Sequence, residues 1–207
     1  MSNTKKMLIE VARQLFAENG KKDVTMNDIA EASKKGRRTL YTYFNNKEEI
    51  YKAVIDKELD TILDRLTVVS NQKTEPDIKL TNHILTHLDA VKNVVERNGS
   101  LRADFFHDIY EVERKRRKID VMEIALLRSI ISEGIEKNIF KRMDIDLSSM
   151  IIFYAIKGLE VPYIRQNISL EFERNKNSIV DFIFTGIKKS SPKSSRANLA
   201  PIGKRTM

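Results

Sequence analysis

The chain has 207 residues, of which 41% are hydrophobic and 32% are charged, and its formal net charge is +8. It contains no cysteine, which excludes disulfides, thiolate metal sites and cysteine nucleophiles. We find no run of about 18 apolar residues and no apolar stretch typical of a signal peptide, so we expect no membrane span and a cytoplasmic protein. Only 7 Gly and 4 Pro interrupt a sequence rich in Leu, Ile, Lys and Glu, which favours an all-α fold.

The positive charge is concentrated at the C-terminus. Residues 188–207 hold six basic and no acidic side chains, and the preceding 187 residues carry 31 basic against 29 acidic groups. The pI of about 9.5 is therefore largely a property of the tail, and bulk charge is weak support for nucleic-acid binding. We interpret residues 190–207, which are rich in Ser, Pro and Lys, as a basic disordered tail.

Apolar side chains at three- and four-residue spacing mark helices near the N-terminus. The first ends at Gly20, a typical C-terminal stop. Thr25 followed by Asp28 resembles a capping box at the start of a short helix, and residues 33–36 make a break before the next one. The three predicted helices cover about residues 4–19, 26–32 and 37–43.

Helical patterns continue through the rest of the chain. Asn46 can cap a long helix, because Glu48 and Glu49 in its first turn suit the positive end of the helix dipole. Further helices are predicted at about 77–97, 101–117, 119–138, 147–167 and 170–188. The sequence thus predicts an all-α protein of about nine helices, with a head over 1–46, a helical body over 47–189 and a tail over 190–207.

Two short helices separated by a tight break are the skeleton of a helix-turn-helix. Ile29, Ala30, Leu40 and Phe44 can form its small core. The free face of the second helix is left with Arg, Thr and Tyr side chains. Arginine can hold guanine O6 and N7 with two hydrogen bonds, and Thr, Tyr and Lys reach phosphate oxygens, so this face suits DNA.

The segment from Thr39 to Glu49 reads Thr-Leu-Tyr-Thr-Tyr-Phe-Asn-Asn-Lys-Glu-Glu. Together with Val-Thr-Met-Asn-Asp-Ile-Ala at 24–30, it resembles the N-terminal domain of the TetR family of transcriptional regulators over residues 7–47. The resemblance implies a three-helix DNA-binding head, a connecting helix and a helical body that binds an effector and dimerises. The residues predicted to bind DNA are Thr25, Lys35, Arg37, Arg38, Thr39, Tyr41, Thr42, Tyr43 and Lys47.

The turn of this motif departs from the family pattern. The usual Ala-Gly-Val-Ser-Lys-Gly is replaced by Ser-Lys-Lys-Gly-Arg-Arg at residues 33–38. Lys34 stands where the family has glycine, so we expect it to adopt a positive φ, which is costly for a residue with a Cβ. Four of the five positions 34–38 are cationic, which predicts a steep dependence of DNA binding on salt.

The body carries weaker signals. His83 and His87 are four residues apart and share a helix face, as metal ligands can, but no cysteine or fixed third ligand accompanies them and we predict no metal. The basic run 114–118 is interpreted as a solvated helix end or loop, with a second nucleic-acid or acidic-partner patch as the alternative. Aromatic and soft apolar side chains can line an effector cavity, although core packing is the alternative for each. The candidate effector-pocket residues are His83, His87, Phe105, Phe106, Tyr110, Met122, Phe153 and Tyr154.

Residues 150–163 and 179–187 are apolar nearly all round, so helices there must be buried on most sides. The resemblance places them as the final two helices, which form a four-helix interface with a second copy. Gly158 would permit close helix approach, and Pro162 should kink its helix. The candidate dimer-interface residues are Ile151, Gly158, Leu159, Phe182 and Ile183.

The predicted function is a sequence-specific transcription regulator, a ligand-responsive repressor that binds a palindromic operator as a dimer. Its partners are double-stranded operator DNA, a small-molecule effector and a second copy, without a cofactor. An enzyme would need a catalytic constellation, and the sequence has no phosphate loop, no His-Glu-x-x-His and no nucleophile elbow. A sequence-independent nucleic-acid binder that uses the tail and the basic runs is the other alternative, and it would lose most of its affinity on removal of residues 189–207.

Overall fold

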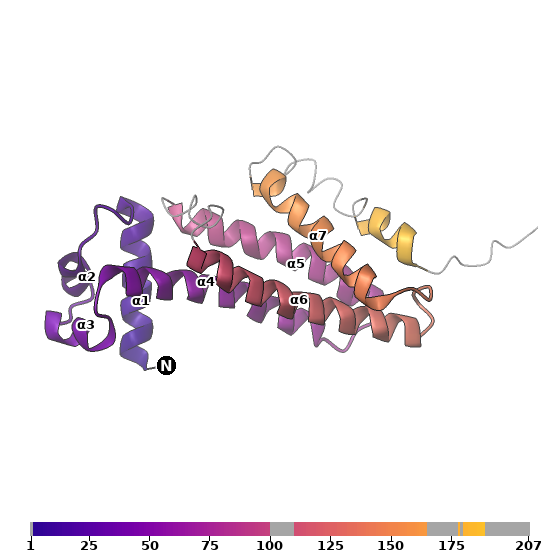
Figure 1. The fold of residues 1–207 in the computed structure, drawn as a ribbon, viewed down its shortest axis with the longest axis horizontal. Helices are drawn as coiled ribbons and strands as arrows, with labels where there is room; N and C mark the ends of the chain where they lie inside the picture. The colour runs from indigo at the N-terminus through magenta and orange to yellow at the C-terminus, as the bar shows by residue number, and fades with distance from the viewer. Residues whose placement is uncertain (1, 100–109, 165–177, 179, 189–207) are drawn as a thin grey trace, which may run out of the picture.

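The computed structural model describes residues 2–99, 110–164, 178 and 180–188. A head of three helices lies at one end of an elongated molecule, and α4 runs from this head into a helical body (Figure 1). The prediction of an all-α fold is confirmed. The helices are α1 (Asn3–Asn19), α2 (Met26–Ala32), α3 (Arg37–Tyr43), α4 (Lys47–Ser70), α5 (Pro76–Arg97), α6 (Tyr110–Glu136) and α7 (Ile145–Ile164), and residues 180–187 form a further helical segment.

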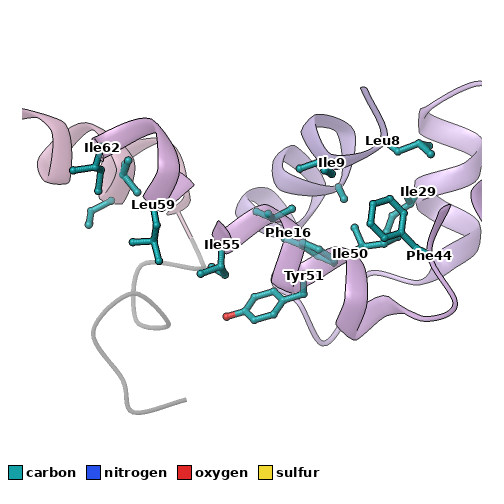
Figure 2. Close-up of a cluster of buried hydrophobic side chains, with 14 of the residues drawn as sticks. Leu8, Ile9, Phe16, Ile29, Phe44, Ile50, Tyr51, Ile55, Leu59 and Ile62 are labelled. Atoms are coloured by element: carbon teal, nitrogen blue, oxygen red, sulfur yellow. The ribbon is translucent and has the colours of Figure 1, made fainter. Parts of the chain in front are cut away.

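The head is organised around a compact apolar core (Figure 2). Phe16 of α1 meets Tyr51 of α4 edge to face, with ring centroids 6.1 Å apart, a geometry that aromatic pairs favour. The core predicted for the helix-turn-helix is confirmed, because each of its members is at most 4% exposed: Ile29, Ala30, Leu40 and Phe44.

The core of the head continues into the body along α4. Ile50 and Val54 of α4 are fully buried among head side chains, and Leu59 and Ile62, one and two turns further on, belong to the same cluster. This cluster also contains Val91 of α5 together with Val94, Val95 and, from α6, Ile119. Helix α4, which begins at Lys47, therefore packs in both the head and the body.

One helix spans the predicted break between two helices in the middle of the chain, while residues 101–109 of the first predicted helix lie outside the described residues. The sequence reading placed a break at residue 118, but α6 runs without interruption from Tyr110 to Glu136. The prediction of a break was wrong: the basic run 114–118 was interpreted as a helix end or loop, but no Gly or Pro occurs between residues 110 and 133 to end a helix. Lys118 is exposed on the helix, whereas Arg116 turns inward to an ion pair with Glu160.

A second apolar cluster fills the far part of the body and joins α5, α6, α7 and the 180–187 segment. Phe140, which is 2% exposed, packs directly on the backbone of α6 at Gly134. A Cβ at Gly134 would lie 2.0 Å from the ring of Phe140. Lys141 N donates to the Ile187 carbonyl over 2.9 Å, which ties the end of the 180–187 segment to the loop after α6.

Gly134→Ala is therefore expected to destabilise the protein. Alanine is the better helix former by about 1 kcal/mol, but its Cβ would clash with the ring of Phe140, which is 2% exposed, and overpacking of this kind typically costs about 1–3 kcal/mol. Chemical denaturation should show a lower unfolding midpoint. Gly186→Ala is the control, because a Cβ there meets no atom within 4 Å; equal effects of the two substitutions would contradict the steric explanation.

No helix in the ranges described above is both long enough and apolar enough to cross a membrane.

Candidate DNA-binding surface and body cavity

Thr25 forms the N-terminal cap of α2. Its Oγ1 accepts a hydrogen bond from Asp28 N over 3.3 Å, and its own N–H donates to Asp28 Oδ2 over 2.8 Å. The capping box predicted from the sequence is therefore confirmed. The hydrogen bonds that Thr25 donates lower the pKa of Asp28. Thr25 is exposed, so it lies at the surface while it orients the first helix of the motif.

The turn between α2 and α3 is built around Lys34, whose φ is +51°. The expectation of a positive φ at this position is confirmed. Lys34 N donates to the Glu31 carbonyl over 2.9 Å, and Lys35 N donates to the Ala30 carbonyl over 3.1 Å. Ser33, which is buried, donates its hydroxyl to the same Ala30 carbonyl over 3.0 Å. These bonds fix a tight turn despite the lysine at its left-handed position.

Lys34→Gly should stabilise the protein, because residues with a Cβ pay about 1–2 kcal/mol in the left-handed region. The greater freedom of glycine in the unfolded chain removes part of this gain, so we expect the free energy of unfolding to rise by at most about 1 kcal/mol. Urea denaturation measures the change. Lys34→Ala removes the same charge but keeps the Cβ, so an equal gain in both variants would assign the effect to charge repulsion instead.

Helix α3 is anchored on one side and open on the other. Leu40 is fully buried, and Phe44, which follows the helix, is 3% exposed. Tyr43 is half-buried against the same core. Tyr41 is 50% exposed, and Thr42 is also exposed, with its hydroxyl donated to the Arg38 carbonyl over 2.9 Å. The second helix of the motif thus presents a polar face to solvent.

The turn and the start of α3 form a cationic surface, which consists of Lys34, Lys35, Arg37 and Arg38. All four side chains are exposed, and none is paired with an acidic side chain in the part of the chain that the structure describes. Lys34 was not among the predicted DNA contacts, yet it lies on this surface. Unpaired exposed cations at the start of the second helix are suited to phosphate and to guanine edges.

Lys47, which was predicted to bind DNA, uses its ammonium for contacts within the chain. Its ammonium donates to the carbonyls of Lys21, Lys22 and Val24 over 2.7, 3.1 and 2.8 Å. An ammonium has three donors, so all of them are used inside the chain. Lys47 therefore holds the loop between α1 and α2 against the start of α4. The sequence reading missed this because the accepting carbonyls lie more than twenty residues away.

The body contains a cavity of about 40 Å³. Its apolar lining comes from α4, α5 and α6: Leu59, Ile62, Val91, Val94, Val95 and Ile119. Its polar lining comes from α5, α6 and α7: His87, Arg116, Asp120, Glu123, Lys157 and Glu160. The space is an order of magnitude smaller than the roughly 300–1,000 Å³ of typical small-molecule sites.

A buried ionic network borders this cavity. His87 donates from Nδ1 to Glu123 Oε1 over 2.7 Å and from Nε2 to Glu160 Oε1 over 2.9 Å. Arg116 donates to the other oxygen of Glu160 over 3.1 Å. His83 connects Glu123 Oε1, at 3.2 Å, to the Ser70 hydroxyl, at 3.1 Å. The network therefore joins α4, α5, α6 and α7.

The network sets the protonation of its members. Burial alone would lower the pKa of His87, but the carboxylates of Glu123 and Glu160 raise it to about 9. Burial would raise the pKa values of these two carboxyls, but His87 and the other cations near them lower each to about 2. Burial raises the pKa of Asp120, and Lys157, 3.3 Å away, only partly offsets it. At neutral pH His87 is an imidazolium between two carboxylates.

Only some of the residues predicted to line the effector pocket lie at the cavity. His87 lines the cavity, and His83 is buried beside it. Phe153 is 1% exposed in the second apolar cluster, whereas Met122 and Tyr154 are 45% and 62% exposed and do not line the cavity. Phe105 and Phe106 and the side chain of Tyr110 lie outside the described residues. Among residues 2–99, 110–164 and 180–188, no group of three or more His, Asp or Glu is arranged to hold a metal.

Of the charged lining residues other than histidine, only Arg116 was interpreted from the sequence, as part of a basic run at a solvated helix end or loop, and no role was predicted for Asp120, Glu123, Lys157 or Glu160. A signal was present on α6, where Arg116, Asp120 and Glu123 follow one another at helical spacing, and on α7, where Lys157 and Glu160 are three apart.

Helix α7 leaves an apolar stripe uncovered. Its exposed members recur at helical spacing: Leu147, Met150, Ile151, Tyr154 and Val161. Phe182, on the 180–187 segment, is 83% exposed. Of the residues predicted at a dimer interface, Gly158 is also exposed, with open space around it, whereas Leu159 and Ile183 are half-buried against their own chain. Tyr154 therefore shares a face with Ile151 rather than with the cavity.

Two short helices joined by a tight basic turn, carried on a helical body, form a helix-turn-helix, the DNA-binding motif of many transcriptional regulators. Residues 8–54 match the family described as bacterial regulatory proteins, tetR family. The N-terminal head of the chain is thus a DNA-binding domain of the tetR type.

Similar proteins agree with this assignment over most of the chain. The HTH-type transcriptional regulator YhgD of Bacillus subtilis is 23% identical, with 88% of this chain and 96% of that protein covered. The fatty acid metabolism regulator protein of the same organism is 22% identical, with 87% and 93% covered. A transcriptional regulator from Cytophaga hutchinsonii has the same fold, with a TM-score of 0.76, 20% identity and coverage of 91% and 100%.

Proposed function

We propose that this regulator binds a palindromic operator as a C₂ dimer and releases it when a small molecule binds the body, in the cytoplasm, most simply as a repressor. The observation that carries the proposal is the cationic surface at the turn and the start of α3, which is exposed and has no acidic partner among the described residues. The N-terminal residues of the second helix of such a motif contact base edges in the major groove. Arg37 and Arg38 are assigned to bases or phosphates there, with Lys34, Lys35, Tyr41 and Thr42 beside them.

The exposed stripe of α7 supports the dimer. A contiguous apolar stripe on a helix is costly to leave in water and marks an interaction site. Phe182 and Ile151 are 83% and 60% exposed, values unusual for side chains of this size in a core-facing helix. A two-fold axis through this stripe would bury it against its own copy. Two recognition helices would then face DNA about one helical turn apart, or a multiple of it.

The cavity supports the proposal that an effector binds the body. It combines apolar and charged side chains and touches α4, the helix that carries the head. Solved relatives include a FadR from Bacillus subtilis in complex with stearoyl-CoA, with a TM-score of 0.63, 22% identity and coverage of 87% and 98%. Because the cavity is small, a ligand of that size would have to open it. A ligand that binds the opened body more tightly than the closed one lowers operator affinity by the ratio of the two affinities.

Selection of bound fragments from a random DNA pool at physiological salt tests the proposal. We expect an enriched palindrome, and its absence would refute operator binding. A variant lacking residues 189–207 should keep the same preference, since the specificity resides in the head. Loss of most of its affinity would instead favour a charge-driven binder that uses the tail.

A further inference from the structure

The C-terminal end of α5 is tied firmly to α4. Arg97 donates from Nε to Glu58 Oε2 over 2.7 Å, and from Nη2 to the other oxygen of the same carboxylate. Asn98 donates its side-chain amide to Glu58 Oε2 over 3.0 Å. Glu58 is fully buried, so the bidentate pair neutralises a charge that would otherwise be costly.

The same end of α5 also touches the head. Arg13 of α1 donates from Nη1 to the main-chain carbonyl of Arg97 over 2.9 Å. Gly99, with φ +42°, passes so close to α1 that a Cβ there would lie 2.5 Å from the Ala17 carbonyl oxygen. The body helix therefore meets the head directly, in addition to their connection through α4.

A carboxylate on α1 completes a ring. Glu10 accepts from Arg13 Nε over 2.8 Å and from Lys57 of α4 over 2.7 Å. Lys57 is the neighbour of Glu58 in the chain, so the contacts run from α4 to α1, from α1 to α5, and from α5 back to α4. We call this ring the head–body clamp; it consists of Glu10, Arg13, Lys57, Glu58 and Arg97.

The clamp adjoins the cavity. Val91, Val94 and Val95 line the cavity from the last turns of α5, and the Val94 carbonyl accepts from Asn98 over 2.6 Å. On α4, the lining residue Leu59 follows Glu58 directly. A ligand that enlarges the cavity must displace one of the four helices that line it, α4, α5, α6 or α7. Displacement of α4 or α5 changes the distances within the clamp.

We propose that the head–body clamp is the element through which the body sets the position of the DNA-binding head, with Arg13 as its positioning residue. The inference rests on the proposed function, in which a body ligand controls operator binding. It assigns the coupling to side chains that touch neither DNA nor the cavity.

Spin labels in the full-length chain test the clamp without an effector. The chain has no native cysteine, so Glu31→Cys on α2 and Glu136→Cys on α6, both exposed, place one label on the head and one on the body. Pulsed electron–electron distance measurements are made with and without Arg13→Met, in protein diluted with unlabelled chain. We expect Arg13→Met to broaden and shift the distribution. Methionine retains an apolar stem but cannot bridge Glu10 and the Arg97 carbonyl.

Arg128→Met is the matched control, since it removes an Arg128–Asp146 ion pair of 2.5 Å that lies outside the clamp. It should leave the distribution unchanged. Circular dichroism confirms that each variant is folded, and Arg13→Lys, which can keep the ion pair with Glu10, should give a distribution closer to that of the parent. An unchanged distribution in folded Arg13→Met would overturn the clamp, even if the random-pool selection yields a palindrome. Failure of that selection alone would refute operator binding and leave the distance result standing.

Discussion

Replacing both Arg37 and Arg38 by alanine should abolish enrichment of a palindromic operator while the dimer remains intact. Each bidentate contact to a base is worth about 1–3 kcal/mol, so the two together correspond to a loss of roughly 30-fold or more in specific affinity. Both side chains are exposed and make no ion pair among the described residues. Their removal should therefore leave the fold unchanged. Fluorescence anisotropy with the selected operator measures the loss.

The control removes the same charge elsewhere. Arg128 and Arg142 are exposed cations on and after α6, and their double alanine variant should retain operator preference. If both double variants weaken binding by the same factor, the binding is driven by net charge, as expected for a sequence-independent binder. The slope of log affinity against log salt concentration further distinguishes operator-specific binding from binding driven by net charge. Each lost phosphate contact reduces this slope by about one unit.

Replacing His87 by glutamine should destabilise the body strongly. Glu123 and Glu160 would then be buried without the imidazolium that lies between them, and loss of one partner of a buried ion pair costs about 3–5 kcal/mol. Urea denaturation should show the loss. The double variant His87→Gln/Glu123→Gln removes an uncompensated carboxylate as well, so it should recover part of the stability. A double variant less stable than the single one would contradict this electrostatic account.

The buried ionic network also predicts that the free energy of unfolding depends on pH. The pKa of His87 rises on folding from 6.5 to about 9. Its contribution to the free energy of unfolding is therefore complete below pH 6.5 and is lost as the pH increases through about 9. Glu123 and Glu160 have pKa values lowered from 4.5 to about 2, so their contribution is present above pH 4.5 and is lost toward about pH 2. Unfolding at several pH values should show a decline above pH 6.5 that is smaller in His87→Gln.

The structure of the head could be predicted largely from local signals in the sequence. The spacing of Leu40 and Phe44, the pairing of Thr25 with Asp28 and the lysine at a glycine position each depend on neighbouring residues, so the core, the capping box and the positive φ of Lys34 could be predicted. The role of Lys47 could not, since its partner carbonyls become neighbours only when α1 and α4 pack together.

The side-chain contacts of the body were less predictable, because they too form only when helices distant in the sequence pack together. Glu123 and Glu160 lie 36 and 73 residues from His87, and only the packing of α5, α6 and α7 brings the three together. Tyr154 was predicted to line a cavity because aromatic side chains can do so between helices, but the rotation of α7 about its axis places it on the exposed stripe. Periodicity fixes which residues share a face and not which neighbour that face meets.

The unbroken core along α4 has a consequence for how the protein opens. Head side chains such as Phe16 depend on Ile50 and Tyr51, and the same apolar cluster extends to Val95 and Ile119. We therefore expect a fragment that ends at residue 46 to remain unfolded, and the most protected amides of α1 and α4 to exchange hydrogen together, through global rather than local opening. The head should therefore not unfold independently of α4, because side chains of that helix complete its core.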